Sequence, residues 1–423
     1  MATHSRRGFL SAAGAALGGA FALPGLSAAV QTSSSPYRRP KLKITDIRTA
    51  EVRVHGHQTH VRIYTDQGIF GHGEATDAAD GAVPIIQRRF RPMLIGQDPL
   101  NVDYLFERLR TAGIFAGAQG GQHTTALSGV EIALWDLAGK ALGLPVYQLL
   151  GGKMRDRIRM YCDSARHEPE DPKTPETLAW IKDHGFTAVK IDCDDARNPH
   201  RWDSVNWTAN KLEIDYMVER VGYVRDFFPR EIELAVDGHG RFDMSTGKRL
   251  AREFEQFHLM FFEEPVPAEN VKAMRDVRES TITPICFGEN RFLRHGFIDI
   301  LEAAAADVVM PDLQKCGGLL EGRKIADLAH TYYVSFAPHC VVSPIGTMAS
   351  CHVCAATPNF LALEWHWMRD YEIWRNWVQE GDVLNNGFIE LPERPGLGVT
   401  MNEEAARAKR IAGTPWFEAW PGA

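Results

Sequence analysis

The chain has 423 residues, which is enough for two domains and a large buried core. Hydrophobic residues make up 44% of it and charged residues 24%, as is typical of a soluble globular protein. The formal net charge is −7 and no stripe of lysine and arginine is visible, which argues against nucleic acid and anionic membranes as partners.

The first 29 residues have the layout of an export signal. Arg6 and Arg7 form a twin arginine, and an apolar run rich in alanine and glycine leads to the small residues Ser27-Ala28-Ala29. We expect a twin-arginine signal over residues 1–29, a tether over residues 30–40 and a periplasmic protein. The alternative is a disordered N-terminus that happens to contain two arginines. After the signal, no apolar run is long enough to span a bilayer, so we expect no membrane anchoring.

Residues 41–155 have the pattern of an α+β domain. Alternating apolar and polar residues predict strands over 44–54 and 61–74, which Asp66-Gln67-Gly68 interrupts. The stretch 80–143 predicts helices, because apolar residues recur at helical spacing, most clearly over 127–140. Strands followed by helices indicate a separate domain.

Residues 156–384 alternate short apolar runs with helical stretches, which is typical of a parallel βα barrel. Eight such runs favour a closed barrel, because closure leaves no exposed sheet edge. The segment 385–423 is expected to return to the N-terminal domain. The predicted strands are 157–161, 188–192, 234–237, 261–263, 285–289, 308–312, 334–338 and 361–364.

Three of these strands end in a carboxylate at equal steps. Asp237 precedes Glu263 by 26 residues, and Glu263 precedes Glu289 by 26, about the length of one strand, loop and helix. Three neighbouring carboxylates repel one another unless a divalent cation lies among them, and an all-oxygen set suits Mg²⁺ or Mn²⁺. His239 follows Asp237 by two residues, a spacing that places both side chains on one face of a strand.

Other polar residues also end predicted strands, and the carboxyl ends of barrel strands are where catalytic residues gather. These additional candidates are Lys190 and Asp192 on the second strand, Asp312 on the sixth, His339 on the seventh and Glu364 on the eighth.

The motifs resemble those of the enolase superfamily, mandelate racemase type, and most of all the galactonate dehydratase-like acid-sugar dehydratases. The resemblance runs from about residue 41 to the C-terminus. It implies an α/β fold in which a modified TIM barrel, (β/α)7β, lies beside an α+β capping domain built from the N-terminal region and the C-terminal segment. The matching stretches include Val236-Asp-Gly-His-Gly-Arg, Phe262-Glu-Glu-Pro, Gly288-Glu289, Pro311-Asp312, Ala337-Pro-His339-Cys, Ile95-Gly-Gln-Asp-Pro and Pro395-Gly-Leu-Gly-Val.

The resemblance also implies a role for each candidate. His339 would be the base that removes the α-proton, and Asp312 would fix its tautomer. His239 would be the acid that protonates the departing β-hydroxyl, and Glu364 an electrophilic donor to the enediolate. The Mg²⁺ ligands would be Asp237, Glu263 and Glu289.

Lys190 and Asp192 are where the sequence departs from the family pattern. Many relatives carry a second lysine at the position of Asp192, where it serves as a base on the other face of the substrate. An ionised Asp192 cannot take that role, so we expect it to orient a substrate hydroxyl, and Lys190 to neutralise a carboxylate of the substrate or of the metal site. One base suffices for dehydration, whereas racemisation usually needs two.

We therefore expect a Mg²⁺-dependent hydro-lyase that converts a sugar acid, an aldonate or aldarate, into a 2-keto-3-deoxy acid. His55 and Asp77, in loops of the first domain, are expected to contact the substrate, together with the insert at residues 202–207. The open alternatives are an epimerase, racemase or cycloisomerase of the same superfamily, and a non-catalytic sugar-acid binding protein. The resemblance also suggests a homo-oligomer.

Overall fold

The computed structural model describes residues 39–76, 79–117, 120–163, 167–203, 205–367 and 370–420. Lys41–Ala423 belong to one structural unit. The expected export signal at 1–29 and nearly all of the tether at 30–40 lie outside the described residues. Within the described ranges, no helix combines the length and the apolar character that crossing a membrane requires.

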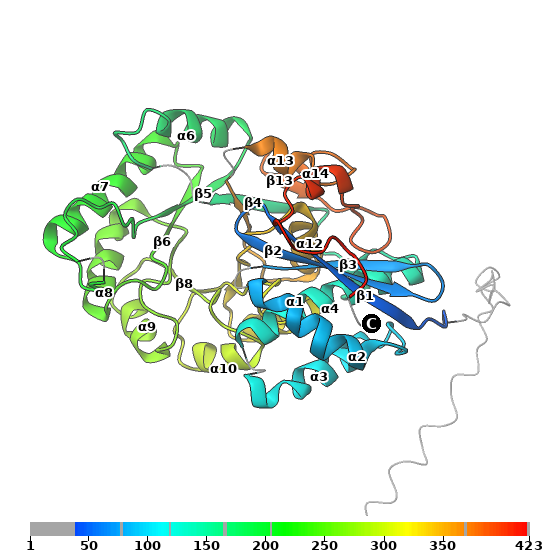
Figure 1. Ribbon diagram of the computed structural model, residues 1–423. Coiled ribbons are helices and arrows are strands. Elements are labelled where there is room, and N and C mark those ends of the chain that lie inside the picture. Colours follow the sequence, from blue (N-terminus) through cyan, green and yellow to red (C-terminus); the bar gives the residue numbers. More distant parts are fainter. Residues whose placement is uncertain are drawn as a thin grey trace, which may run out of the picture. The chain divides into compact units, whose positions relative to one another are not determined.

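An antiparallel sheet and a layer of helices form the N-terminal part (Figure 1). The strands β1 (Ile44–Arg53), β2 (His57–Thr65) and β3 (Phe70–Ala75) pair in that order. The helix α4 (Gly121–Leu142) lies so close to β3 that a Cβ on Gly71 would meet the Ala133 carbonyl at 2.0 Å. Shorter helical segments are η1 (Ala79–Gly81), α1 (Ala82–Ile85), η2 (Ile86–Phe90), α2 (Arg91–Leu94), α3 (Val102–Ala112), η3 (Ile114–Ala116) and α5 (Val146–Leu149).

Eight parallel strands form the barrel-like part. Seven are hydrogen-bonded in the order β10-β9-β8-β7-β6-β5-β4, and β11 pairs with β4 on the other side. Between β10 and β11 the link is an isolated bridge from Phe336 to Phe360. The strands are β4 (Arg157–Asp163), β5 (Ala188–Asp192), β6 (Glu233–Asp237), β7 (Phe261–Glu263), β8 (Ile285–Phe287), β9 (Val308–Val309), β10 (Ser335–Phe336) and β11 (Leu363–His366).

The eight predicted strands are all present, but three are shorter than predicted. β8 ends before Gly288, which takes φ +144°, a backbone conformation outside the strand region. β9 and β10 end shortly before Pro311 and Pro338, which have no N–H to donate to a neighbouring strand. The predicted site residues after these strands therefore lie on loops, not on the strands themselves.

Helices cover the outside of the barrel strands, as Figure 1 shows for α6 to α10. These helices are α6 (Thr174–Asp183), α7 (Lys211–Phe227), α8 (Met244–Glu253), η4 (Phe254–Phe257), α9 (Val271–Arg278), α10 (His295–Glu302), α11 (Leu319–Thr331) and α12 (Pro344–Ala356).

Along each barrel strand, side chains point alternately toward the surrounding helices and toward the barrel interior, so an outer and an inner apolar core form. On β5, Val189 and Ile191 belong to the apolar cluster shared with the helices, whereas Ala188 belongs to the smaller inner cluster. Lys190 and Asp192 lie on the same face as Ala188, because side chains two residues apart on a strand point the same way. Polar residues thus enter the barrel interior near the carboxyl ends of its strands.

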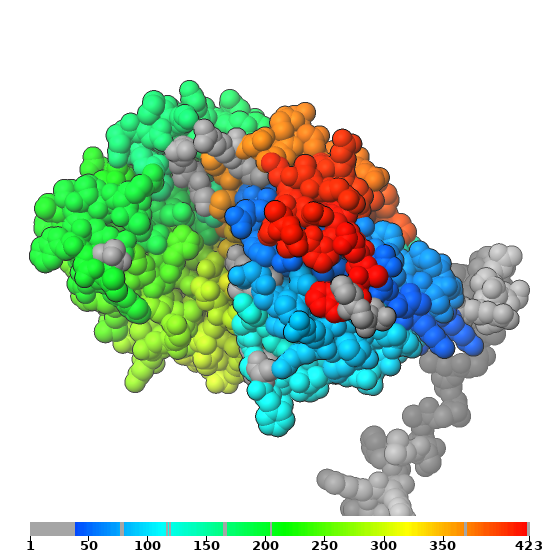
Figure 2. Space-filling model, viewed as in Figure 1, coloured from blue at the N-terminus to red at the C-terminus, as the bar shows by residue number. Residues whose placement is uncertain are grey.

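The C-terminal segment contacts both parts of this unit. Beyond α13 (Tyr371–Arg375), the hairpin of β12 (Leu384–Asn385) and β13 (Phe388–Glu390) adds antiparallel to β4. After α14 (Glu403–Arg407), bridges join Arg410 to Val52 and Trp416 to Ala50 in β1. Figure 2 shows this red end of the chain lying against the blue N-terminal strands.

Candidate active site

Lys190 lies at the centre of a buried group of carboxylates. Its ammonium nitrogen is 2.5 Å from Glu263 Oε2, 3.0 Å from Glu364 Oε1 and 3.2 Å from Asp237 Oδ2. Asp163 Oδ1, at the end of β4, is 3.7 Å away. Burial alone would lower the pKa of Lys190, but Asp163, Glu263 and Glu364 outweigh it and hold the pKa well above its usual range. Lys190 therefore neutralises carboxylates of the protein itself.

Glu263 provides the observation that fits a metal ion. It is fully buried on β7, and its Oε1 has no hydrogen-bond partner among the described residues, although burying an unpaired carboxylate oxygen is costly. Burial and the charges of Asp237 and Glu289 raise the pKa of Glu263 well above its usual range despite Lys190. A carboxylate oxygen without a hydrogen-bond partner, close to other carboxylates that repel it, is what a divalent cation with oxygen ligands requires.

Asp192 and His239 also lie beside Asp237. One ligand atom from each of these three residues falls within 4.8 Å of the other two. Burial and then Asp163 raise the pKa of Asp192 to about 8, and its Oδ1 has no hydrogen-bond partner. The structure thus gathers Asp237 with two further groups that can hold a cation. The expected ligand set Asp237, Glu263 and Glu289 stays a prediction.

His239 approaches Asp237 for a reason other than strand alternation. β6 ends at Asp237, and His239 lies on the following turn with φ +45°. Its backbone N–H donates to Asp237 Oδ1 at 2.7 Å, and its Nε2 is 3.6 Å from Asp237 Oδ2. The two side chains share one site as expected, but the turn, not the strand, brings them together.

A carboxylate that the sequence analysis did not single out holds the other side of the His239 ring. Asp194 Oδ1 is 3.0 Å from His239 Nδ1. Burial by itself lowers the pKa of His239, but Asp237, Asp194 and Asp192 outweigh it and raise the pKa to about 11. Asp194 continues the alternation of Lys190 and Asp192, and this i, i+2 pattern is the signal that could have identified it.

His339 and Asp312 form the predicted pair. His339 Nδ1 lies 2.8 Å from Asp312 Oδ2, and both residues are buried on the loops after β10 and β9. Nε2 faces the carboxylates, 3.0 Å from Glu289 Oε2 and 3.7 Å from Glu364 Oε2. Burial would lower the pKa of His339, but Glu364, Glu289 and Asp312 hold it well above its usual range.

Glu364 is an acceptor in this arrangement. Its Oε2 accepts a hydrogen bond from the Cys340 N–H at 2.7 Å, and its Oε1 faces Lys190. Burial raises the pKa of Glu364, but Lys190 and His339 outweigh it and lower the pKa below its usual value. An ionised Glu364 cannot donate a hydrogen bond, so its expected donor role requires that it first gain a proton.

The loop between β1 and β2 reaches the same end of the barrel. His55, between β1 and β2, lies with its ring centroid 4.8 Å from that of His366 at the end of β11. Burial and then His366 lower the pKa of His55 to about 3, against a small opposing effect of Asp163. Asp163 and His366 were not predicted, although each lies two residues beyond an inward-facing strand residue, Tyr161 and Glu364. Asp77 lies outside the described residues.

A cavity of about 450 Å³ opens beside His239. Trp207, from the long insert before α7, is part of its wall, as are Glu264 and Arg291 from the loops after β7 and β8. Among the described residues that line it, His239 is present and His339 is not, so the cavity adjoins the site on the His239 side. The described residues that line it are Trp207, His239, Gly240, Glu264, Pro267, Ala268, Glu269, Asn290 and Arg291.

Comparison with known proteins identifies the family of this chain. The model of the enolase C-terminal domain-like family matches residues 175–405, and that of the mandelate racemase and muconate lactonizing enzyme N-terminal domain matches residues 38–151.

Individual relatives cover nearly the whole chain. A D-xylonate dehydratase of Haloferax volcanii is 41% identical over 89% of this chain and 91% of its own. A D-galactonate dehydratase of Verminephrobacter eiseniae is 34% identical over 86% of this chain and 93% of its own. The crystal structure of a mandelate racemase/muconate lactonizing enzyme-like protein from Rubrobacter xylanophilus superposes with a TM-score of 0.83 at 43% identity, covering 89% of this chain and 99% of that one. The chain therefore belongs to the enolase superfamily, in its mandelate racemase and muconate lactonizing enzyme branch.

Proposed function

We propose that this enzyme is a Mg²⁺-dependent dehydratase of a sugar acid, an aldonate or aldarate, which it converts into a 2-keto-3-deoxy acid. D-xylonate and D-galactonate, the substrates named for two relatives, define the chemical class: a carboxylate with hydroxyls on both the α- and the β-carbon. Removal of the α-proton and the β-hydroxyl turns such a molecule into an enol, which tautomerises to the keto acid.

One observation supports the proposal more than any other. Two imidazoles, each paired with its own carboxylate, converge on one group of charges: His339 contacts Glu364, Glu364 contacts Lys190, and Lys190 contacts Asp237. Asp237 in turn lies beside His239. A dehydration needs a base for the α-proton and an acid for the leaving hydroxyl, and this arrangement offers one imidazole for each.

The first step is α-proton removal by His339, which can accept this proton only after its own Nε2 has lost one, because the surrounding carboxylates outweigh burial and raise its pKa. With the Nδ1–H donated to Asp312, the Nε2 of His339 is the nitrogen that faces the site and receives the proton. Lys190 supplies a fixed positive charge beside the carboxylates, and Glu364, once protonated, donates to the enediolate oxygen.

The second step is loss of the β-hydroxyl. The Nε2–H of His239 protonates the departing oxygen, which leaves as water. Asp192, whose Oδ1 has no hydrogen-bond partner among the described residues, and His55 would contact substrate hydroxyls.

Asp237, Glu263 and Glu289 would hold the cation. When bound, Mg²⁺ supplies positive charge that offsets these carboxylates and the second negative charge that α-proton removal places on the substrate carboxylate. The unpaired Glu263 Oε1 supports this assignment. Mn²⁺ suits the same oxygen set.

The test is a panel of aldonates and aldarates, including D-xylonate and D-galactonate, incubated with the purified protein and Mg²⁺. Keto acid is detected as its semicarbazone. The proposal expects keto acid from at least one member, and its loss when EDTA removes the metal. Exchange of the α-proton without loss of water would instead indicate an epimerase or racemase. A wholly silent panel would indicate a sugar-acid binding protein.

Export is a separate part of the proposal. The twin arginine at Arg6-Arg7 and the small residues before residue 30 support a periplasmic enzyme delivered by the twin-arginine route. Cell fractionation of the full chain and of a variant with both arginines replaced by lysine tests it. We expect the wild-type protein in the periplasm and the variant in the cytoplasm. We also propose a homo-oligomer, for which light scattering gives the mass.

A further inference from the structure

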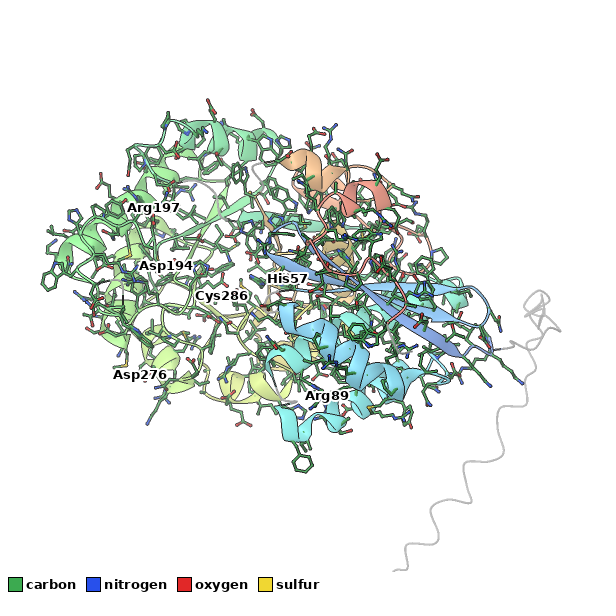
Figure 3. All side chains as sticks on the ribbon, in the orientation of Figure 1. His57, Arg89, Asp194, Arg197, Asp276 and Cys286 are labelled. Carbon is green, nitrogen blue, oxygen red and sulfur yellow. The ribbon has the colours of Figure 1, made fainter. Side chains whose placement is uncertain are left out.

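The side chain of Asp194 contacts the proposed acid, His239. The residue lies between β5 and α7 and is labelled in Figure 3. Its Oδ1 is 3.0 Å from His239 Nδ1, where the side chains are 21% and 46% exposed. When a carboxylate accepts a hydrogen bond from one ring nitrogen of a histidine, the ring is held in place and its other nitrogen points in a fixed direction.

The backbone fixes the distance between these two residues. The N–H of Cys193, next to Asp194, donates to the Asp237 carbonyl at 2.8 Å and so ties the loop to the end of β6. On the other side of His239, the Gly238 and Gly240 N–H groups donate to the carbonyls of Glu263 and Glu264 at 3.0 and 2.7 Å. Both partners of the His239–Asp194 pair are thus held by the frame of adjacent strands.

The neighbouring Asp195 faces elsewhere, which makes the contact of Asp194 distinctive. Asp195 accepts hydrogen bonds from the Arg197 side chain, with Oδ1 3.0 Å from Nε and Oδ2 2.9 Å from Nη2. It belongs to the same loop and carries the same charge, but within the described residues it pairs with Arg197 and not with His239. It therefore serves as a matched control.

We propose that Asp194 is a positioning residue for the leaving-group step, an inference that rests on the proposed dehydratase function. Asp194 accepts the Nδ1–H of His239 throughout and directs the Nε2–H at the β-hydroxyl. When the bond between the β-carbon and its oxygen breaks, the Nε2 proton moves to that oxygen, which departs as water. The electron pair left by α-proton removal forms the carbon–carbon double bond of the enol, and His239 is left neutral with its Nδ1–H still on Asp194.

This arrangement separates the two halves of the reaction. Asp194 contacts His239, whereas His339 is held by Asp312, so α-proton removal should proceed without Asp194. A variant that lacks the Asp194 carboxylate should form the enediolate and return it to substrate more often than it completes elimination. The ratio of α-proton exchange to keto acid formation measures this partition directly.

The experiment follows both products by NMR in D₂O with Mg²⁺ and a sugar acid that the wild-type enzyme dehydrates. We expect Asp194→Asn to lower kcat for keto acid by about 10- to 100-fold while KM stays within about twofold. Deuterium should still enter the α-position, so the ratio of exchange to elimination rises by a similar factor. Asp195→Asn should behave as the wild-type enzyme does.

The variants His239→Asn and Asp194→Asn/His239→Asn test whether Asp194 acts through His239. If it does, the double variant is no slower in elimination than His239→Asn alone, because both changes remove one function. Asp194→Ser, measured alongside with circular dichroism for each variant, provides a second folded variant with the same expected change in ratio.

Three outcomes overturn the inference: elimination by folded Asp194 variants at the wild-type rate, exchange and elimination falling together, or a further loss in the double variant. Failure of the proposed function looks different, because the wild-type enzyme itself would then yield no keto acid from any sugar acid.

Discussion

At the scale of single residues, Lys190 supplies the positive charge that allows several carboxylates to be buried together while no ligand is bound. It is 1% exposed and contacts Glu263, Glu364, Asp237 and Asp163. Several buried carboxylates around one ammonium are tolerable only while that ammonium is present, because an uncompensated buried charge is far more costly than a paired one.

Lys190→Met should therefore destabilise the fold as well as abolish dehydration. We expect the free energy of unfolding to fall by about 3–5 kcal/mol at neutral pH without added metal, because the change removes one partner of a buried ionic network. Urea denaturation measures it. Lys211→Met is the control: that lysine is 82% exposed and forms a surface pair with Asp215 on its own helix, so no measurable change is expected. Equal stability of Lys190→Met and wild type would contradict the role assigned to Lys190.

At the scale of elements, a carboxylate from α4 caps a barrel helix. The N-terminus of α11 has Gly318 at its cap position, without a side chain to accept the first N–H groups. Glu131 accepts them instead: Leu319 N–H donates to Oε2 at 2.7 Å and Leu320 N–H to Oε1 at 3.0 Å. α11 follows the loop that carries Asp312, so this contact also ties the Asp312–His339 pair to the N-terminal part.

Glu131→Ala should lower the free energy of unfolding by about 2–4 kcal/mol, because it leaves two buried helix N–H groups and the Trp135 indole N–H without their acceptor. Thermal and urea unfolding measure the loss. Glu279→Ala is the control: Glu279 is an exposed glutamate, so its loss should change the free energy of unfolding little. A stability equal to that of wild type would show that these N–H groups find other acceptors.

The helix α12 contains a histidine that makes the fold sensitive to acid. His352 is buried, accepts from the Tyr147 N–H at Nδ1 and faces the Leu397 carbonyl with Nε2, both at 3.1 Å. Burial lowers its pKa to about 4, against an opposing effect of Leu397. Because the unfolded chain binds a proton near pH 6.5 and the folded one does not, this contribution to stability is complete above pH 6.5 and is lost as the pH falls toward 4.

His352→Gln should weaken the pH dependence of unfolding between pH 6.5 and 4 by about 1.4 kcal/mol per pH unit. Urea denaturation at several pH values gives the slope, which is independent of any constant loss of stability in the variant. His295→Gln, at an exposed position on α10, should keep the wild-type slope. An unchanged slope in His352→Gln would mean that His352 is protonated in the folded state.

Much of this arrangement could be predicted from element patterns. β5, β6 and β7 follow from apolar alternation, and the strand-end rule found Lys190, Glu263 and Asp237. It also found Asp312 and His339, although these lie on loops, because the loops that follow such short strands keep the residues at the same end of the barrel.

What could not be predicted depends on side-chain direction beyond the strand ends. Glu289 follows Gly288, whose φ of +144° turns the chain and brings Glu289 toward His339. The contact of Asp194 with His239 depends on how the loop after β5 is hydrogen-bonded to β6. Residue spacing places Glu289 and Asp194 at the same end of the barrel but does not show which side chain each one contacts, so these contacts appear only once adjacent strands are in register.

At the scale of the whole molecule, metal binding and folding should be linked. The carboxylates that would hold the cation come from β6, β7 and the loop after β8, so they come together only in the folded barrel. A ligand that binds only the folded state stabilises it by mass action.

Mg²⁺ should therefore raise the melting temperature, with a stabilisation of about 2.7 kcal/mol at a concentration of 100 times Kd. Differential scanning calorimetry against Mg²⁺ concentration measures it, and EDTA should reverse it. Glu263→Gln should remove the shift, whereas Glu279→Gln, at an exposed position at the C-terminal end of α9, should keep it. A shift that survives in Glu263→Gln would place the cation elsewhere.

The central claim is that two imidazoles perform separate steps on one substrate. The most direct measurement compares His339→Asn with His239→Asn in D₂O with Mg²⁺ and a sugar acid that the wild-type enzyme dehydrates, following α-deuteration and keto acid together. We predict that His339→Asn shows neither, whereas His239→Asn incorporates deuterium and forms almost no keto acid. Deuterium incorporation by His339→Asn, or dehydration by His239→Asn at close to the wild-type rate, would contradict the account.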